Sequence, residues 1–559
     1  MKSRLIPAAL AAGLALVACK PAISPGVAVF ESFRYEGRDA IYQAHPLPGK
    51  DAVYNPILPG WYSDPSFCSN GEGDYFLVTS TFSYFPGVPI FHSRDLLNWT
   101  QVGHVLDRPS QLTGLGRQHT SGGIYAPDIK YNPKNRTYYM ITTNVGTGNF
   151  LVKTQNPFGA WSEPILLPQV QGIDPSLFFD DDGRAYIVNN DDAPGGRPEY
   201  DGHRTIRIVE YDVDRDCTIG ERKVIVNKGV HPEDKPIWIE GPHLYKIDGK
   251  YYLMCAEGGT SDQHSEVVFR SDSPMEGYKP WSRNPILTQR HLAADRPDPV
   301  TCTGHADIIR TPEGEWWGVF LGCRPLKGGF ENLGRETFLM KVRWSDDGFP
   351  FFTEGNETVP LTIRRSGVTV GEHPVFGNFK VEDPFDGDRL GMAWMTLRGP
   401  ADGLYSLKGG ALELKCSPAR ATKFETPALL LRRLQHHVFT ASTRMRFVPE
   451  GTEAAGMLLY KDERHQYFLK VCLQDDGFPA VVVEKVGAGT AVLGCVPLPE
   501  KWSVLDLSVA SDDGQTFRFE CSVDGADPVT VAQGVDASYL STAVAGGFTG
   551  TTVGLYAVK

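Results

Sequence analysis

Two short apolar runs separated by a polar turn recur along the first two thirds of the chain. In the clearest copy the runs are residues 244–247 and 251–255, and the turn between them is Asp248-Gly249. Residues that favour strands on both sides of an Asp-Gly pair predict a β-hairpin. An acidic residue, Glu240, stands just before the first run of this hairpin.

Five copies of this hairpin can be aligned on their turn residue. Each copy has an aromatic residue three positions after the turn residue, and we compare the position nine residues before it. The turn residues of these copies are Gly73, Asn135, Gly183, Gly249 and Gly314. They are 62, 48, 66 and 65 residues apart. This spacing is too irregular for a short solenoid repeat, and it is typical of a β-propeller, whose blades are small antiparallel sheets with variable outer loops. The positions that would open on the central axis are Asp64, Ala126, Asp174, Glu240 and His305.

The pattern changes towards the C-terminus. Residues 384–559 contain alternating strand-like runs, such as 439–447 and 517–523, which predict a β-sandwich. A chain of 559 residues is also too long for one core. We therefore predict an all-β protein with a five-bladed β-propeller over residues 55–355 and a β-sandwich domain over 384–559. Residues 20–54 are predicted to be an irregular lead-in, and 356–383 a connector.

The N-terminal residues have the composition of an export signal. Lys2 and Arg4 precede an apolar run over residues 6–18, which is too short to span a membrane as a mature helix. The run ends Leu-Val-Ala-Cys at Cys19 and resembles the bacterial lipobox. Residues 1–19 are therefore predicted to be a lipoprotein signal peptide with Cys19 lipidated. The protein would be exported to the bacterial periplasm or cell envelope and would meet the membrane only through a lipid anchor. An ordinary cleaved signal peptide with a chance cysteine is the alternative.

Charge and composition limit the classes of molecule that the protein is expected to bind. The formal net charge of −12 argues against nucleic acid, which requires a basic face, and disfavours an anionic polysaccharide. An aromatic content of 11% fits a β-rich protein that binds neutral sugars. The ten cysteines form no Cys-x-x-Cys pair and show no zinc-ligand spacing, so no metal site is predicted.

Eight ordered segments carry a family resemblance. Three of them resemble the catalytic motifs of family 43 glycoside hydrolases: NPILPGWYSDPS at 55–66, GIDPSLF at 172–178 and EGPHLY at 240–245. Five others resemble the β-xylosidase and α-L-arabinofuranosidase branch: STFSYFPGV at 80–88, SGGIYAPD at 121–128, AEGGT at 256–260, GHAD at 304–307 and LGRET at 333–337. The C-terminal run GFTGTTVGL at 547–555 resembles the accessory domain of the same enzymes.

The resemblance implies a role for each matching polar residue. Asp64 would be the general base, Glu240 the general acid, and Asp174 the group that orients substrate and raises the pKa of the acid. Arg335 would bond sugar hydroxyls, although a structural ion pair is the alternative for this residue. His305 would hold the base or a central water or ion, and a buried histidine without a direct role is its alternative. No cofactor is implied, and a structural calcium ion or a water near His305 is left open.

Three aromatic residues are implied to bind the sugar. Phe82 and Tyr125 would be walls of the sugar pocket, with ordinary core packing as the alternative. At Tyr125 the β-xylosidases usually have Trp, so this chain departs from their pattern. Phe548, from the sandwich, would close the pocket, although the run around it also departs from the family.

The function implied is that of an inverting exo-glycosidase that hydrolyses non-reducing-end β-D-xylosyl residues from xylo-oligosaccharides or arabinoxylan. An α-L-arabinofuranosidase, or an enzyme with both activities, is the alternative. A surface lipoprotein that binds sugars without catalysis is a further alternative, but the presence of all three carboxylates favours the enzyme. The expected partners are neutral pentose oligosaccharides, and the sequence leaves the oligomeric state open.

Overall fold

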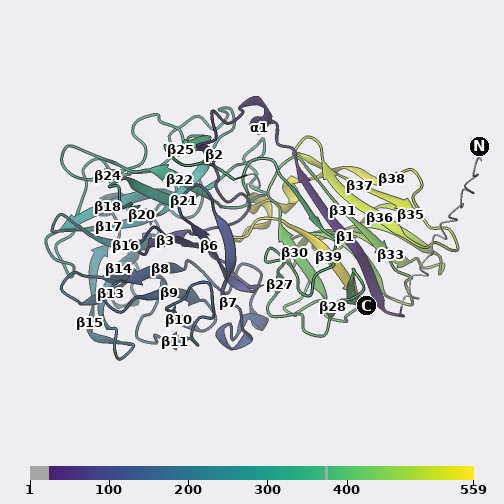
Figure 1. Ribbon diagram of the computed structural model, residues 1–559, viewed down its shortest axis with the longest axis horizontal. Coiled ribbons are helices and arrows are strands. Elements are labelled where there is room, and N and C mark those ends of the chain that lie inside the picture. Colours follow the sequence, from purple (N-terminus) through teal and green to yellow (C-terminus); the bar gives the residue numbers. More distant parts are fainter. Residues whose placement is uncertain (1–23, 372–374) are drawn as a thin grey trace, which may run out of the picture.

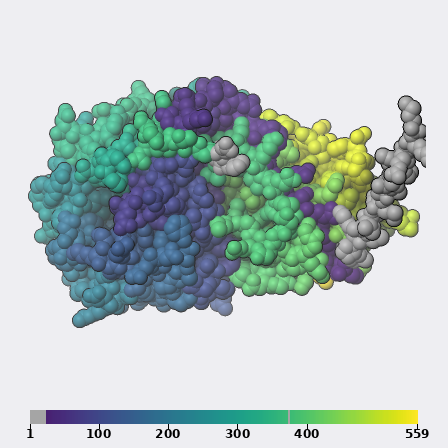
Figure 2. All heavy atoms as spheres, in the orientation of Figure 1, coloured from purple at the N-terminus to yellow at the C-terminus, as the bar shows by residue number. Residues whose placement is uncertain are grey.

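Strands make up almost all of the regular structure in both halves of the molecule (Figure 1). The computed structural model describes residues 24–371 and 375–559, so the predicted signal peptide and Cys19 lie outside the described residues. The all-β prediction is confirmed. A propeller is followed by a β-sandwich, and in the space-filling view the blue atoms of the propeller lie directly against green atoms of the sandwich (Figure 2). No helix within the described ranges is long and apolar enough to cross a membrane.

Five successive antiparallel sheets form the blades. The first two blades consist of β3 (Ser66–Ser69), β4 (Tyr75–Val78), β6 (Gly87–Ser93) and β7 (Thr100–Leu106), then β8 (Asp128–Asn132), β9 (Thr137–Asn144), β10 (Gly148–Thr154) and β11 (Ile165–Leu166). The third and fourth consist of β12 (Ile173–Phe179), β13 (Ala185–Asp192), β14 (Arg204–Asp212) and β15 (Cys217–Asn227), then β16 (Glu240–Ile247), β17 (Lys250–Glu257), β18 (Ser265–Ser271) and β19 (Lys279–Pro280). The fifth consists of β20 (Thr301–Arg310), β21 (Trp316–Cys323) and β22 (Glu336–Lys341).

Each of the five predicted hairpins forms the two innermost strands of one blade. In each blade the first strand pairs antiparallel with the next strand of the sequence; these first strands are β3, β8, β12, β16 and β20. These inner strands also lie next to one another in a closed ring around the axis. The second strands are buried on both faces, as β13 shows, because each blade packs against its neighbours.

The ring is closed by the segment just before the first blade. Leu58 exchanges two backbone hydrogen bonds of 3.3 Å with Thr337 on β22. The Asn55 side chain donates to the carbonyl of Leu339 at 2.9 Å and accepts from its amide at 3.0 Å. Residues from the start of the propeller sequence thus pair with β22, the last strand of the fifth blade. This pairing covers the edge of the three-stranded blade and closes the propeller.

The sandwich consists of two packed sheets. One sheet has the order β28 (Tyr405–Leu407), β29 (Leu412–Lys415), β1 (Val27–Gly37), β31 (Phe439–Arg446), β36 (Leu505–Ser511), β37 (Thr516–Val523) and β38 (Val529–Asp536). The other has the order β30 (Leu429–Arg433), β39 (Thr552–Val558), β32 (Ala454–Asp462), β33 (His465–Leu473), β34 (Pro479–Val486) and β35 (Thr490–Pro497). Alternate residues of each strand, such as Phe439 and Ala441 on β31 and Tyr467 and Leu469 on β33, meet in one core.

The prediction of an irregular lead-in is wrong for residues 27–37. They form β1, which lies inside the sandwich sheet between β29 and β31 and appears as the purple strand among green and yellow ones in Figure 1. Phe30 and Phe33 on this strand are fully buried in the sandwich core, which explains the pairing. After α1 (Ala40–Ala44), the chain enters the propeller at β2 (Ala52–Tyr54).

The connector is also more regular than predicted. Within it, β25 (Thr362–Arg364) pairs with β2, and β26 (Lys380–Asp383) pairs with β1. Two further small sheets are β23 (Arg343–Trp344) with β24 (Pro350–Phe351), and β5 (Tyr84–Phe85) with β27 (Thr396–Leu397). The last pair joins the first blade to the sandwich side, and α2 (Thr542–Ala545) precedes the final strand.

Candidate active site

The inner strands carry a backbone distortion at the positions predicted to open on the axis. Asp64, Asp174 and His305 have φ angles of 53°, 52° and 56°, in the left-handed region that is costly for residues with a side chain. In the fourth blade Gly241 takes this conformation, with φ 53°, one position after Glu240. The strand registers of blades three to five shift at the same place. Such bulges re-aim side chains and are frequent beside active sites.

A pocket of about 410 Å³ opens at these distortions. The predicted residues that line it are Asp64, Phe82, Tyr125, Asp174, Glu240, His305, Arg335 and Phe548. The remaining lining residues are Ala126, Ile173, Arg204, Trp238, Gly259 and Thr260. The structure therefore brings together every pocket residue that the sequence singled out.

A larger cavity, of about 850 Å³, lies between α1, the connector and the sandwich. Its buried carboxylate is Asp39, which is 3.3 Å from the guanidinium of Arg324 and accepts a hydrogen bond from the amide of Val438. Among the described residues, this cavity has one buried carboxyl group, whereas the pocket on the propeller axis has three. The pocket on the propeller axis is therefore the better candidate for chemistry.

Asp64 is held as an anion. Arg335 Nη1 lies 3.3 Å from its Oδ1, and the Ser80 hydroxyl donates to its Oδ2 at 2.5 Å. Burial alone would raise the pKa of Asp64, but the charges of Arg335 and His305 and the Ser80 bond outweigh it, so the pKa is lowered. An ionised carboxylate of this kind can accept a proton from water.

Glu240 has the opposite environment. Burial, and after it the negative charge of Asp174, raises the pKa of Glu240 to about 8. Its Oε1 is buried and has no hydrogen-bond partner among the described residues. Glu240 therefore carries a proton at neutral pH and keeps an oxygen free to face a substrate atom.

Asp174 lies between the start of β16, next to Glu240, and a cation. Its Oδ2 accepts a hydrogen bond from the amide of Gly241 at 3.1 Å and lies 3.6 Å from Nε2 of His305. Burial alone would lower the pKa of His305, but its bond to Asp174 and the charges of Asp64 and Asp174 raise it to about 9. His305 is therefore a cation at neutral pH and balances part of the negative charge of the site.

Three aromatic rings form one wall of the pocket. Phe82 stacks against Phe548 with centroids 6.2 Å apart, and Tyr125 meets Phe82 and Phe548 edge-on at 5.8 and 5.7 Å. The Arg335 guanidinium lies 5.3 Å from the Phe548 ring, and its Nη2 is 3.5 Å from the Phe548 carbonyl oxygen. The wall is apolar on one side and meets the Asp64–Arg335 pair on the other, as a sugar with an apolar face and a polar rim requires.

Sequence reasoning missed Arg204 and Trp238 on the pocket, and Ser80 beside Asp64. The Arg204 guanidinium lies 4.6 Å from the Trp238 ring, and Trp238 is 37% exposed with φ 52°. Trp238 stands two residues before Glu240 in the sequence, but its exposure and its place on the pocket are seen only in the structure. Arg204 lies at the start of β14, an outer strand outside the hairpin register, so its position gave no clue.

Three groups of side chains within the described ranges have the spacing of metal ligands. One of them, Asp128 with His243 and Asp307, lies on the axis beneath the pocket. Lys130 Nζ is 3.0 Å from Asp128 and 2.9 Å from Asp307, and it already supplies their counter-charge. Between this group and His305 is a cavity of about 10 Å³, which is room for one water. Calcium takes about six to eight oxygen ligands, so this set of nitrogens and paired carboxylates does not fit it.

Cys302, Cys323 and Glu331 form the second group, and the exposed residues His231, Glu233 and Asp234 form the third. Cys255, Cys302 and Cys323 are buried among apolar strands, and all nine described cysteines are free thiols. The Cys302 thiol donates to Glu331 at 3.2 Å. None of these groups is part of the pocket.

Two family models match the chain. The model described as glycosyl hydrolases family 43 matches residues 53–350, and the model described as beta xylosidase C-terminal concanavalin A-like domain matches residues 382–559. The two matches cover the propeller and the C-terminal part of the sandwich.

Named relatives span nearly the whole chain. A non-reducing end alpha-L-arabinofuranosidase of Bacteroides ovatus is 35% identical over 519 residues, covering 90% of each chain. A xylosidase/arabinosidase of Butyrivibrio fibrisolvens is 38% identical over 517 residues, covering 90% of this chain and 95% of the relative. The crystal structure of a GH43_12 protein from capybara gut metagenome is 41% identical, with a TM-score of 0.88, and covers 96% of this chain and 100% of that one.

Proposed function

Because the chain belongs to glycosyl hydrolases family 43, and is therefore a glycoside hydrolase, we propose that it removes single β-D-xylosyl residues from the non-reducing ends of xylo-oligosaccharides or arabinoxylan. The observation that carries the proposal is the pair of carboxyl groups in one pocket, with Asp64 held ionised and Glu240 held protonated. A glycosidase needs one carboxyl group of each kind. A protein that only binds sugars does not need two carboxyl groups in different protonation states.

The two groups would act in a single displacement. Glu240 gives its proton to the glycosidic oxygen as the bond from that oxygen to C1 breaks. A water attacks C1 from the opposite face and gives its proton to Asp64. The C1–O bond to water then replaces the bond to the leaving sugar, and the anomeric configuration inverts. Proton exchange with solvent restores both carboxyl groups.

The places of Asp64 and Glu240 in the fold support a mechanism that inverts the anomeric configuration. Asp64 precedes the inner strand of the first blade and Glu240 begins that of the fourth, so they approach the pocket from different sides of the axis. An inverting enzyme keeps its carboxyl groups about 6.5–9.5 Å apart to admit a water, whereas a covalent mechanism brings them to about 5–5.5 Å. Arg335 and the aromatic wall would bind the sugar ring, and Asp174 would hold the proton on Glu240.

The choice of pentose is the finer part of the proposal. The names of the relatives include both activities, and a pocket for a five-carbon sugar presents similar partners to a xylopyranoside and an arabinofuranoside. We expect nitrophenol release from aryl β-D-xyloside to exceed that from aryl α-L-arabinofuranoside in kcat/KM. A higher value for the arabinofuranoside would reverse the assignment, and release from neither substrate would contradict glycosidase activity on these sugars.

We further propose that the small cavity beside His305 holds a water. Hydrolysis by two carboxyl groups needs no cofactor. The cavity has a volume of about 10 Å³, which is room for one water. Each of the three carboxylates that line it, Asp64, Asp128 and Asp174, already has a cationic side chain of the protein beside it, which disfavours a calcium ion. Activity is therefore expected to survive treatment with a calcium chelator.

The location of the protein is likewise a proposal. We propose a lipid-anchored, exported protein, because Cys19 ends a run that resembles a lipobox. Cys19→Ala is expected to abolish incorporation of labelled palmitate and to move the enzyme from the membrane fraction to the soluble one. A Cys19→Ala variant that sediments with membranes as the parent does would contradict the anchor.

A further inference from the structure

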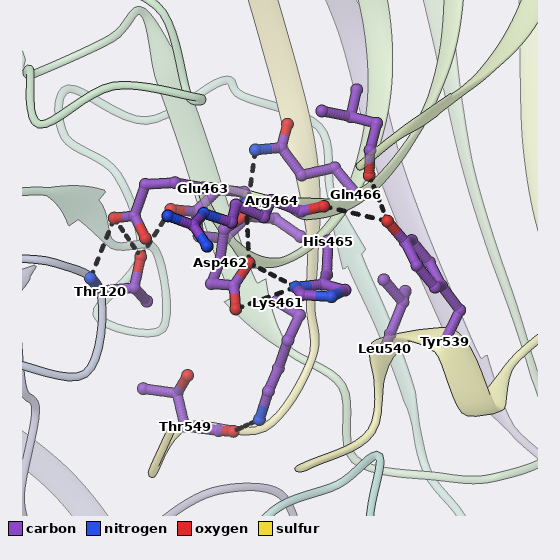
Figure 3. A network of polar contacts seen from close by, with 12 residues as sticks. Thr120, Lys461, Asp462, Glu463, Arg464, His465, Gln466, Tyr539, Leu540 and Thr549 are labelled. Atoms are coloured by element: carbon purple, nitrogen blue, oxygen red, sulfur yellow. Dashed lines mark hydrogen bonds and ion pairs between the residues drawn. The ribbon is translucent and has the colours of Figure 1, made fainter. Parts of the chain in front are cut away.

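A hairpin of the sandwich lies beside the aromatic wall of the pocket. Strands β32 and β33 meet in a tight hairpin, and we call the turn with the strand ends on either side of it, residues 461–465, the anchor turn. Asp462 Oδ1 accepts from the Arg464 amide at 2.7 Å and lies 2.9 Å from His465 Nδ1, and Tyr539 donates to the Arg464 carbonyl at 3.0 Å (Figure 3). These bonds give the turn a defined shape.

Lys461 connects the anchor turn to the loop that carries Phe548. We call residues 546–551 the wall loop. Lys461 Nζ donates to the carbonyl of Thr549, directly after Phe548 (Figure 3). It also donates to the Thr542 hydroxyl at 3.1 Å. Its side chain is 1% exposed, and burial lowers the pKa of Lys461 to about 8. Burying an ammonium costs free energy unless it is hydrogen-bonded or paired, so the bonds of Lys461 to Thr549 and Thr542 hold its side chain in this position.

Glu463 connects the same turn to the propeller. It accepts hydrogen bonds of 2.9 Å from the amide and from the hydroxyl of Thr120, and it pairs with Arg398 (Figure 3). Arg398 is fully buried and donates to the carbonyl of Gln118 at 2.8 Å. Glu463 therefore fixes the propeller segment that contains Ser121.

The two connections meet at Phe548. Its amide donates to Ser121 Oγ at 2.9 Å, one residue after Thr120. Gly547 allows this approach, because a Cβ there would come within 2.5 Å of Ser121 Oγ. Figure 3 shows Lys461 and Glu463 leaving the turn in different directions, one towards Thr549 and the other towards Thr120.

We propose that the anchor turn is a clamp that sets the position of the Phe548 ring, with Lys461 and Glu463 as positioning residues for sugar binding. Neither residue lines the pocket. Lys461 holds the wall loop and Glu463 holds the propeller segment to which that loop bonds. The sandwich thus controls the affinity for the terminal sugar through one turn. The inference rests on the proposed function only in taking the pocket as the place where that sugar binds.

A double-mutant cycle tests the clamp. Phe548→Ala is expected to raise KM for the aryl glycoside by about tenfold, and Lys461→Met by about fivefold, because a displaced ring loses its contact with the sugar. If Lys461 acts through Phe548, the double variant has the KM of Phe548→Ala alone. Glu463→Gln is expected to behave as Lys461→Met does. Lys470→Met is the matched control, since Lys470 pairs with Glu484 on the sandwich sheet, and it should leave KM unchanged.

The outcomes separate the alternatives. If the effects of Lys461→Met and Phe548→Ala on KM multiply in the double variant, the clamp is overturned. A fall in the kcat of Lys461→Met with KM unchanged would also overturn it, because that is the signature of a smaller folded fraction. Lys461→Met removes a buried charge and is expected to fold. The same cycle is read in the dissociation constant of xylose and of arabinose by calorimetry, so it stands even if neither aryl glycoside is cleaved. An uncleaved substrate would contradict the proposed function, and multiplicative effects would contradict only the clamp.

Discussion

Asp64 and Glu240 share one pocket but titrate in opposite directions because their neighbours differ. Both side chains are buried, which alone would raise both pKa values. Around Asp64 a guanidinium, a hydroxyl and a charged imidazole outweigh the burial, whereas at Glu240 the negative charge of Asp174 adds to it. Each effect follows from elementary electrostatics. The difference between an ionised Asp64 and a protonated Glu240 is therefore a consequence of which side chains each blade brings to the axis.

The role of Glu240 can be tested with leaving groups of different acidity. Loss of a general acid costs about 10²- to 10⁴-fold when the leaving oxygen needs a proton, and much less when it leaves as a stable phenolate. Glu240→Ala is therefore expected to lose far more kcat/KM on xylobiose than on 2,4-dinitrophenyl xyloside. Asp64→Ala, the comparison, should lose activity on both substrates. Equal losses by Glu240→Ala on both would remove it from the acid role.

The pH profile follows from the same shifts. Asp64 must be ionised, and its lowered pKa means that activity falls only when the pH drops below the usual range of a carboxyl group. Glu240 must be protonated, so activity falls as the pH rises through about 8. Asp174→Asn removes a charge that raises the pKa of Glu240, and the alkaline limb of kcat/KM should move to lower pH. Asp182→Asn, at an exposed turn of the same blade, is the control. An alkaline limb that Asp174→Asn does not move would contradict this coupling.

Individual site residues could be predicted where they lie in a repeated register or a family motif. Asp64, Asp174, Glu240 and His305 occupy equivalent positions of four hairpins, so their meeting at the axis followed from the spacing. Trp238 lies in a loop and Arg204 on an outer strand, and neither shares that register. Their place on the pocket depends on how the loops fold over the blade, which no local pattern encodes.

At the scale of elements, the hairpins were readable because each is local. An apolar run, a turn with glycine or asparagine and a second run lie within about 15 residues in each copy. Strand β1 was not readable. Its partners β29 and β31 lie nearly 400 residues further along, and an alternating run at the N-terminus does not reveal which sheet will receive it.

One glycine in β16 should be essential to the site. Gly241 has φ 53°, and a Cβ there would come within 2.7 Å of the His305 ring. Gly241→Ala is expected to displace His305 or the start of the strand and to lower kcat/KM by about 10²-fold, as misplacement of about 1 Å can. Gly249→Ala is the control, because Gly249 also has positive φ but a Cβ there meets nothing within 4 Å.

The Gly249→Ala variant should lose about 1 kcal/mol of stability through backbone strain and keep its activity. Thermal unfolding and aryl glycoside kinetics on both variants measure the difference. If Gly241→Ala kept the activity of the wild-type enzyme, the close packing of Gly241 against the His305 ring would not be needed for activity.

At the scale of the whole molecule, the sandwich completes the active site as well as covering the propeller. It supplies Phe548 to the pocket, and its wall loop comes so close to the chain before Arg335 that a Cβ on Gly550 would lie 2.3 Å from the Leu333 carbonyl oxygen. The sequence predicted both domains and named Phe548. It could not predict the anchor turn, because Lys461 and Glu463 read as surface charges of a hairpin until their partners in the other segments are known.

The stereochemistry of hydrolysis tests the central claim most directly. Proton NMR of the anomeric signals, recorded in the first minutes after enzyme is added to a β-xyloside, distinguishes the first product from its mutarotated form. With Asp64 activating water opposite Glu240, α-xylose is expected first and the β-anomer only as mutarotation proceeds. Initial appearance of β-xylose would contradict single displacement and the assignment of Asp64 as the base.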